Sequence, residues 1–156
     1  MVFSHLDESN QPSMVDITPK KSTYRVAKAQ TVLKVPSEIY SQFRDGDIHC
    51  PKGPVFQTAI IAGTMAAKKT SELIPMCHPL PIDKCKIHIF LNEDNHIQIE
   101  VEVAAYYKTG VEMEALTASS IAALTVYDMC KSISHNMEIT TTKLMHKKGG
   151  KSDIHR

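Results

Sequence analysis

The sequence predicts an α+β fold in which an antiparallel sheet carries two long helices on one face. Three observations predict it: apolar residues alternate along four segments, two other segments are apolar at helical spacing, and turn residues separate them. The order is strand, helix, strand, strand, helix, strand, which is the split β-α-β arrangement of ferredoxin-like folds. At 156 residues the chain is long enough for one such domain with one core.

The first half of the chain supplies an arm, a strand and a helix. Residues 1–22 lack periodicity and are predicted to form a mobile N-terminal arm. Alternating apolar residues predict the first strand over 23–35, and a short insertion with a helical turn from Pro36 ends at the turn Asp45-Gly46-Asp47. Residues 53–74 are apolar around most of a helix circumference, so we expect a long and well-buried helix there.

The second half supplies a hairpin, another helix and the last strand. Two runs of alternating apolar residues within 84–105, separated by a turn, predict a β-hairpin with one apolar face. The second long helix is expected over 112–131 and the last strand over 137–145. The folded domain is therefore predicted to span 23–146, and residues 147–156 are predicted to form a basic, glycine-containing tail.

Composition excludes several classes of function. The 18 basic and 17 acidic residues give a net charge of +1, so no overall field favours nucleic acid or an acidic membrane. No apolar run approaches the roughly 20 residues of a membrane-spanning helix. The four cysteines are scattered without a C-x-x-C pair, which favours reduced thiols over disulfides or zinc. We therefore expect a cytoplasmic protein with no metal, no nucleic-acid partner and no membrane partner.

A carboxylate and an ammonium group lie close together near the end of the second long helix. Asp128 and Lys131 are three residues apart, which places them one turn apart on the same helix face. If the pair is buried, each group shifts the ionisation of the other, and together they can move a proton at neutral pH. The alternative is an ordinary surface ion pair, and the spacing alone does not decide between the two.

The start of the same helix offers a second candidate segment. Thr109 and Gly110 precede two carboxylates, Glu112 and Glu114, which flank Met113. These carboxylates either contact a ligand or complement the helix dipole, with Thr109 as a capping residue. Taken alone, the segment favours ordinary capping.

A proline-stiffened loop forms the third candidate. Three prolines within 74–81, Pro75, Pro79 and Pro81, stiffen the segment around Cys77 and His78, which is typical of a loop that presents side chains. Neighbouring residues of an extended chain point in different directions, so this pair poorly suits a thiolate with its base or two ligands of one metal. We expect His78 to contact a phosphate or a heterocycle, with Cys77 packing as a small apolar side chain.

Basic residues are spread over several short groups. They are Lys20, Lys21 and Arg25; Lys52; Lys68 and Lys69; and Lys147, Lys148 and Lys151 around Gly149-Gly150. The chain has neither a P-loop motif nor a G-x-G-x-x-G motif, so a phosphate-bearing ligand must be held by converging side chains. The residues after 146 either form a polar tail or fold over a ligand, and both interpretations stay open.

Seven segments in this order resemble the MoaC family over nearly the whole chain from residue 5. They are Met14-Val15-Asp16-Ile17, Lys52-Gly53, Ala62-Gly63 through Lys68-Lys69-Thr70, Leu73-Ile74-Pro75-Met76-Cys77-His78-Pro79-Leu80, Thr109-Gly110-Val111-Glu112-Met113-Glu114-Ala115-Leu116-Thr117, Leu124-Thr125-Val126-Tyr127-Asp128-Met129-Cys130-Lys131, and Gly149-Gly150-Lys151-Ser152. One departure concerns the residue after Lys52-Gly53, where the family usually carries an acidic side chain and this chain has Pro54.

The resemblance implies an enzyme of molybdenum cofactor biosynthesis with a ferredoxin-like fold. Such an enzyme, a lyase, converts 3′,8-cyclo-7,8-dihydroguanosine 5′-triphosphate to cyclic pyranopterin monophosphate with loss of diphosphate. The resemblance further implies a homohexamer built as a trimer of dimers, with active sites at subunit interfaces. It implies a functional link to a radical SAM enzyme that cyclises GTP and supplies the substrate. No cofactor is expected.

The resemblance also assigns roles by motif. Asp128, Lys131 and Lys52 are the expected catalytic residues. The expected substrate-binding residues are Met76, Cys77, His78, Glu112, Met113, Glu114, Arg25 and Lys147. Two rival functions are a purine-nucleotide-binding module without turnover and a hydrolase that uses Cys77 as nucleophile. Intact Asp128 and Lys131 argue against the first rival, because binding alone does not require that pair.

Overall fold

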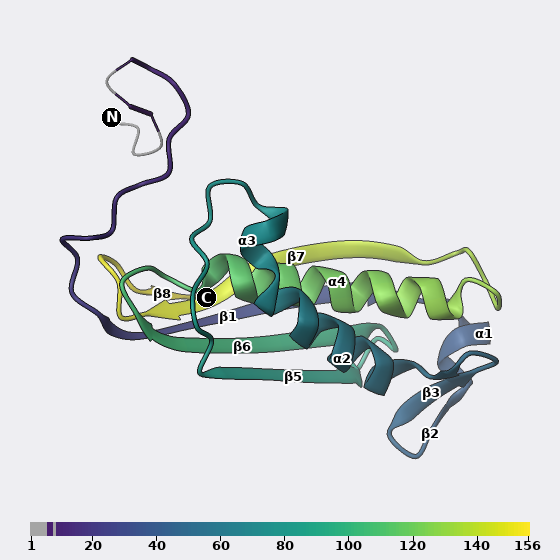
Figure 1. Ribbon diagram of the computed structural model, residues 1–156. Helices are drawn as coiled ribbons and strands as arrows, with labels where there is room; N and C mark the ends of the chain where they lie inside the picture. Colours follow the sequence, from purple (N-terminus) through teal and green to yellow (C-terminus); the bar gives the residue numbers. More distant parts are fainter. Residues whose placement is uncertain (1–5, 8) are drawn as a thin grey trace.

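A five-stranded antiparallel sheet with two long helices on one face forms the body of the protein (Figure 1). The computed structural model describes residues 6–7 and 9–156. In chain order the elements are β1 (Thr23–Lys34), α1 (Ser37–Tyr40), β2 (Phe43–Arg44), β3 (Asp47–Cys50), β4 (Gly53–Pro54), α2 (Val55–Lys68), α3 (Thr70–Leu73), β5 (Lys84–Leu91), β6 (Ile97–Tyr107), α4 (Glu112–Cys130), β7 (Glu138–Lys148) and β8 (Ile154–His155). The sheet order is β5-β6-β1-β7-β8, so the predicted α+β fold is confirmed.

The core lies between the sheet and the two helices. Side chains of alternating residues on β1 and β6, such as Leu33 and Ile99, are fully buried beneath α2 and α4. The two helices approach each other closely because small residues line their contact. A Cβ atom at Gly63 would lie 2.9 Å from the carbonyl oxygen of Ala118, so a larger residue at that position would push α2 away from α4.

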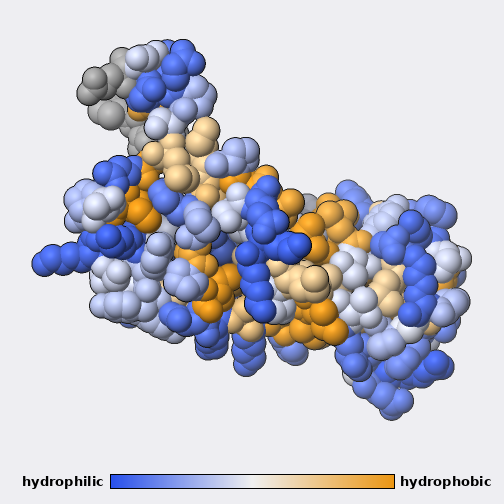
Figure 2. Space-filling model, in the orientation of Figure 1, coloured by the Kyte–Doolittle hydropathy of each residue, from blue (hydrophilic) through white to orange (hydrophobic). Residues whose placement is uncertain are grey.

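The helix predicted over 53–74 differs from the expectation in two ways. It is interrupted at Lys69, so that α2 is followed by the separate short helix α3. The prediction that it is well buried is wrong for its outer side, because α2 packs on β5, β3 and α4 and leaves one side uncovered. We call the exposed apolar side chains of the helical layer the outer helix patch, which consists of Ile61 and Met65 of α2, Leu73 of α3 and Leu124 of α4. Figure 2 shows hydrophobic surface gathered over this helical face, with hydrophilic surface toward the β2–β3 end.

Segments near both ends of the chain contact the domain. Residues 1–5 and Glu8 of the predicted arm lie outside the described residues, while the carbonyl oxygen of Thr18 accepts a hydrogen bond from Lys108 Nζ at 3.0 Å. At the other end, β7 continues to Lys148 and β8 pairs back onto it. The turn between them needs Gly149, whose φ is +89° and whose added Cβ would lie 2.0 Å from the carbonyl oxygen of Tyr24.

Candidate functional site

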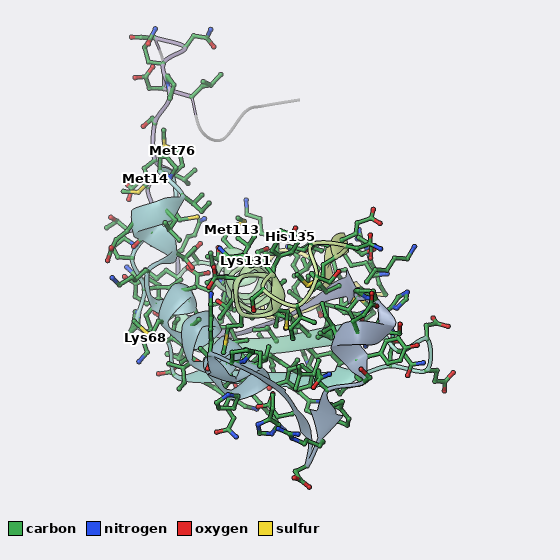
Figure 3. All side chains as sticks on the ribbon, turned by 90° about the vertical axis from the view of Figure 1, so that its right-hand side faces the viewer. Met14, Lys68, Met76, Met113, Lys131 and His135 are labelled. Atoms are coloured by element: carbon green, nitrogen blue, oxygen red, sulfur yellow. The ribbon has the colours of Figure 1, made fainter. Side chains whose placement is uncertain are left out.

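A cavity of about 420 Å³ opens at the N-terminal end of α4. Its walls come from four parts of the chain: the arm, the loop before β5, the start of α4 and the turn before β8. The lining residues are Val15, Ile17, Lys20, Met76, Cys77, His78, Leu80, Thr109, Gly110, Glu112, Met113, Glu114 and Lys151. Figure 3 views the molecule from the end that is on the right in Figure 1, and Met14 and Met76 lie on the same side of that view. The arm and the proline-stiffened loop therefore contribute to one binding space.

Glu114 is the buried acid of this cavity. Only 4% of the residue is exposed, and burial raises the pKa of its carboxyl group to about 7, with a further contribution from the negative charge of Glu112. The same surroundings act on Cys77, since burial first and the charge of Glu114 second raise the pKa of its thiol. At neutral pH, Glu114 is therefore able to hold or release a proton, whereas Cys77 stays protonated.

Beside the cavity, a second carboxylate is neutralised by a basic residue of β7. Glu112 Oε1 lies 3.1 Å from Lys147 Nζ, and both side chains are mostly buried. Arg25 lines the same narrow recess, where its Nε donates a hydrogen bond to the carbonyl oxygen of Tyr107 at 3.4 Å. Arg25 and Lys147 thus form a positive wall next to the cavity.

A separate charged cluster lies at the other end of α4. Asp128 Oδ1 is 2.7 Å from Lys131 Nζ, and Asp128 Oδ2 is 2.9 Å from Lys52 Nζ. Lys52 also donates a hydrogen bond to the main-chain oxygen of Asp128 at 3.0 Å. We call these three residues the Lys–Asp–Lys cluster.

The Lys–Asp–Lys cluster is open to solvent. The side chain of Asp128 is 56% exposed, and hydrogen bonds from Lys131 and Lys52 lower its pKa to about 2. The hydrogen bond to Asp128 in turn raises the pKa of Lys131. The predicted proton transfer requires a buried pair, and within one chain the pair is not buried. The carboxylate of Asp128 is therefore ionised at neutral pH.

Lys52 reaches the cluster because a two-residue turn carries it. Pro51 and Lys52 form the turn that connects β3 to β4. Cys50 of β3 pairs with Gly53 of β4, and Gly53 adopts a φ of +114°. Asp47, at the start of β3, is buried and accepts main-chain hydrogen bonds from the first turn of α2. The turn that presents Lys52 is thereby tied to a helix of the core.

Comparisons with known proteins decide the family. A model of the MoaC family matches residues 14–150. The chain belongs to the MoaC family. It is 50% identical over 152 residues to the cyclic pyranopterin monophosphate synthase of Xanthomonas campestris pv. campestris (strain B100), which covers 97% of this chain and 92% of the relative.

Other MoaC-family relatives agree. The cyclic pyranopterin monophosphate synthase of Syntrophomonas wolfei is 49% identical over 153 residues, 97% of this chain and 96% of the relative. The molybdenum cofactor biosynthesis bifunctional protein of Synechocystis is 52% identical over 98% of this chain and 45% of the relative. The family identified from the sequence motifs is confirmed, and with it the expectation of an enzyme.

The structure brings the residues with expected roles into two groups. All expected substrate-binding residues line the cavity or the recess beside it, and all expected catalytic residues form the Lys–Asp–Lys cluster. Asp128 comes 14 positions after Glu114 in α4, which corresponds to about 20 Å along the helix axis. Within one chain the two groups therefore do not meet.

Three features of the site differ from the sequence analysis. Cys77 and His78 line the same cavity, because the loop is not extended there: the amide of Cys77 donates to the carbonyl oxygen of Ile74 at 3.0 Å. Thr109 also lines the cavity, whereas Val111 is the N-cap of α4 and makes no side-chain capping bond. The sequence analysis missed Asp47, although Pro54 at the N-cap of α2 signals that a cap must come from elsewhere.

A hollow of about 450 Å³ on the open face of the sheet is lined by polar residues such as Lys28 and Glu102, which form an ion pair, and by none of the expected site residues. Among residues 6–7 and 9–156, no group of three or more His, Cys, Asp or Glu residues is placed to hold a metal ion. No helix in those ranges is long and apolar enough to cross a membrane.

Proposed function

We propose that this chain converts 3′,8-cyclo-7,8-dihydroguanosine 5′-triphosphate to cyclic pyranopterin monophosphate and diphosphate, with the cavity and the Lys–Asp–Lys cluster as two parts of one active site. The general activity follows from two findings. The chain belongs to the MoaC family, and its sequence is 49–50% identical to cyclic pyranopterin monophosphate synthases over nearly their full length. The chain is an enzyme of molybdenum cofactor biosynthesis. Its substrate is then the product of a radical SAM enzyme that cyclises GTP, and its cytoplasmic location stays a prediction.

The cavity has the properties of a site for the heterocycle and its phosphates. Its volume falls within the range of roughly 300–1,000 Å³ that small-molecule sites occupy. The carboxyl group of Glu114 is able to accept hydrogen bonds from the amino and ring N–H groups of a purine or pterin. Lys20, His78 and Lys151 line the same cavity and provide hydrogen-bond donors for phosphate oxygens.

The Lys–Asp–Lys cluster has the residue types that the chemistry requires. Opening the imidazole portion of the guanine and rebuilding a pterin needs proton transfers, and expulsion of diphosphate needs positive charge near the leaving group. Lys52 and Lys131 supply that charge, and Asp128 holds both ammonium groups in place. Burial of the cluster would raise the proton affinity of Asp128 and make the exchange of a proton with Lys131 easier.

An assembly in which the cluster of one chain covers the cavity of another would supply this burial. The two groups lie at opposite ends of one rigid helix, too far apart for both to contact a single reacting centre within one chain. The outer helix patch exposes apolar side chains beside α4, as surfaces between subunits do. We therefore propose that active sites form between chains, within a homohexamer built as a trimer of dimers.

Single-turnover conversion of the cyclised GTP substrate tests the function. Wild type is expected to release diphosphate and to give a fluorescent pterin after oxidation, whereas Asp128→Asn is expected to bind substrate without turning it over. Asp94→Asn, in the exposed β5–β6 turn, is the matched control and should react like wild type. If wild type binds the substrate without releasing diphosphate, the chain is a nucleotide-binding module and the proposal fails.

Mixing two inactive variants tests the shared site. Asp128→Asn removes the cluster and His78→Ala weakens the cavity, so each variant alone is expected to lack most activity. After subunit exchange, some mixed interfaces combine an intact cavity with an intact cluster, and activity should return. A mixture that stays inactive, although exchange is shown by mass spectrometry of labelled chains, would place each active site within a single chain.

A further inference from the structure

The first turn of α2 is capped by a residue that does not belong to it. The N-cap residue is Pro54, which has no side-chain group that accepts a hydrogen bond and makes no side-chain cap. The carboxylate of Asp47 takes this role from the start of β3. Its Oδ1 accepts from the amide of Phe56 at 2.7 Å and its Oδ2 from the amide of Gln57 at 3.1 Å, which satisfies two donors of the open helix end.

The same carboxylate closes a loop of chain around Lys52. Asp47 Oδ1 also accepts from the amide of Ile48 at 2.6 Å, so the carboxylate joins the beginning of β3 to the beginning of α2. Between these two points the chain runs through β3, the Pro51-Lys52 turn and β4. Only two residue pairs connect β3 to β4, so this short ladder is a weak support by itself.

We propose that Asp47 is a positioning residue for Lys52: by joining β3 to α2, its carboxylate fixes the turn from which Lys52 reaches Asp128. The inference rests on the proposed function only in that Lys52 belongs to the catalytic group. It assigns Asp47 no contact with the substrate.

The rest of the insertion has its own anchors, so that loss of Asp47 loosens the turn rather than unfolding the domain. The side chain of Ile48 is fully buried, and the rings of Phe43 and Phe56 pack with their centroids 6.0 Å apart. Lys52 has no such anchor, because its side chain is 45% exposed and its ammonium contacts only atoms of Asp128 among the described residues. Its position therefore depends on the geometry of the turn.

Lysine labelling measures the position of Lys52 without substrate. At neutral pH, an ammonium group held by a carboxylate reacts slowly with acetic anhydride, and mass spectrometry gives the rate at each lysine relative to the exposed Lys34. In Asp47→Ala we expect Lys52 to be labelled several-fold faster than in wild type, at the rate found in Asp128→Asn. Asp47→Asn, which keeps the shape and one acceptor oxygen, should lie between Asp47→Ala and wild type. An unchanged relative rate at Lys52 in both Asp47 variants overturns the proposal.

Two further arms separate positioning from general stability. Ala67→Gly weakens α2 at its far end and should lower the melting temperature while leaving the relative labelling of Lys52 unchanged. In Asp47→Ala/Asp128→Asn, Lys52 should react no faster than in Asp128→Asn alone, because both changes act through the same contact. An additive increase would show that Asp47 acts otherwise, and so overturns the proposal.

Turnover completes the test and distinguishes it from a failure of the proposed function. Asp47→Ala is expected to lower kcat strongly with little change in KM, since Asp47 makes no contact with the substrate in this proposal and acts only through the position of Lys52. If wild type itself releases no diphosphate, the proposed function fails, while the labelling still measures whether Asp47 holds Lys52. If labelling rises and kcat stays at the wild-type value, the role of Asp47 in positioning a catalytic Lys52 is refuted.

Discussion

The two ends of α4 hold carboxylates in opposite environments. Glu114 at the N-terminal end is buried, and its pKa is raised to about 7. Asp128 at the C-terminal end is exposed between two ammonium groups, which lower its pKa to about 2. Both residues lie on one helix, so the difference comes from what surrounds each end and not from the helix itself. Burial and ion pairing thus separate two acids of similar intrinsic strength by several pKa units.

This contrast suggests different tasks for the two acids. A carboxyl group that titrates near neutral pH is able to exchange a proton with a bound heterocycle, whereas a permanently charged one organises cations. In an interface between chains, both would face one substrate. Each side of this contrast can be removed separately by mutation.

The largest effect is expected at the charged end. Lys131→Ala should lower the single-turnover rate by roughly 100- to 10,000-fold, the range associated with loss of a positioned acid or base. Lys143→Ala, an exposed lysine of β7, is the matched control and should leave the rate near that of wild type. Equal rates for the two variants would mean that the Lys131–Asp128 contact is the ordinary surface ion pair considered in the sequence analysis.

The next effect concerns the buried end and appears as pH-dependent stability. The folded pKa of Glu114, about 7, lies above its ordinary value of 4.5, so the folded state holds this proton more tightly. Its contribution to stability is therefore fully present below pH 4.5 and is lost as the pH rises to 7 and above, by roughly 3 kcal/mol in total. Glu114→Gln should remove that loss, and urea unfolding of both proteins at pH 5 and pH 8 measures it. Parallel changes in the two proteins would show that Glu114 is not perturbed.

The smallest effect is expected at Cys77. Because burial raises the pKa of its thiol, Cys77 is not a thiolate at neutral pH, and Cys77→Ser should change turnover by less than about 10-fold. Serine keeps the size of the side chain, so the cavity wall is preserved. Loss of turnover in Cys77→Ser, with substrate binding retained, would instead favour the cysteine-dependent hydrolase.

Site features that depend on residues close together in the sequence could be predicted, whereas those that depend on distant residues could not. The Asp128–Lys131 contact could be predicted because helical periodicity alone brings residues three apart together. The contribution of Lys52 came only from the family motif, since it depends on a turn 76 residues away along the chain. The raised pKa of Glu114 could not be derived from local sequence, because the cavity that it lines is completed by the arm and the loop at 74–81, which lie outside its helix.

The secondary structure was predicted better than the burial of the helix surfaces. Alternation along β1, β5 and β6 gave strands close to those observed, because each strand buries one face against the helices. The apolar sequence of α2 suggested burial all round, yet Ile61 and Met65 are exposed. An apolar pattern indicates that a helix surface favours burial. It does not show whether the same chain or another copy of it covers that surface.

Because α4 is one continuous helix, it sets a fixed separation between Glu114 and Asp128. Insertion of one residue between them would turn Asp128 by about 100° and move it by about 1.5 Å relative to Glu114. The same insertion in the exposed β5–β6 turn would be absorbed by the loop. Working variants of this enzyme should therefore tolerate length changes in that turn while keeping the number of residues in α4 constant.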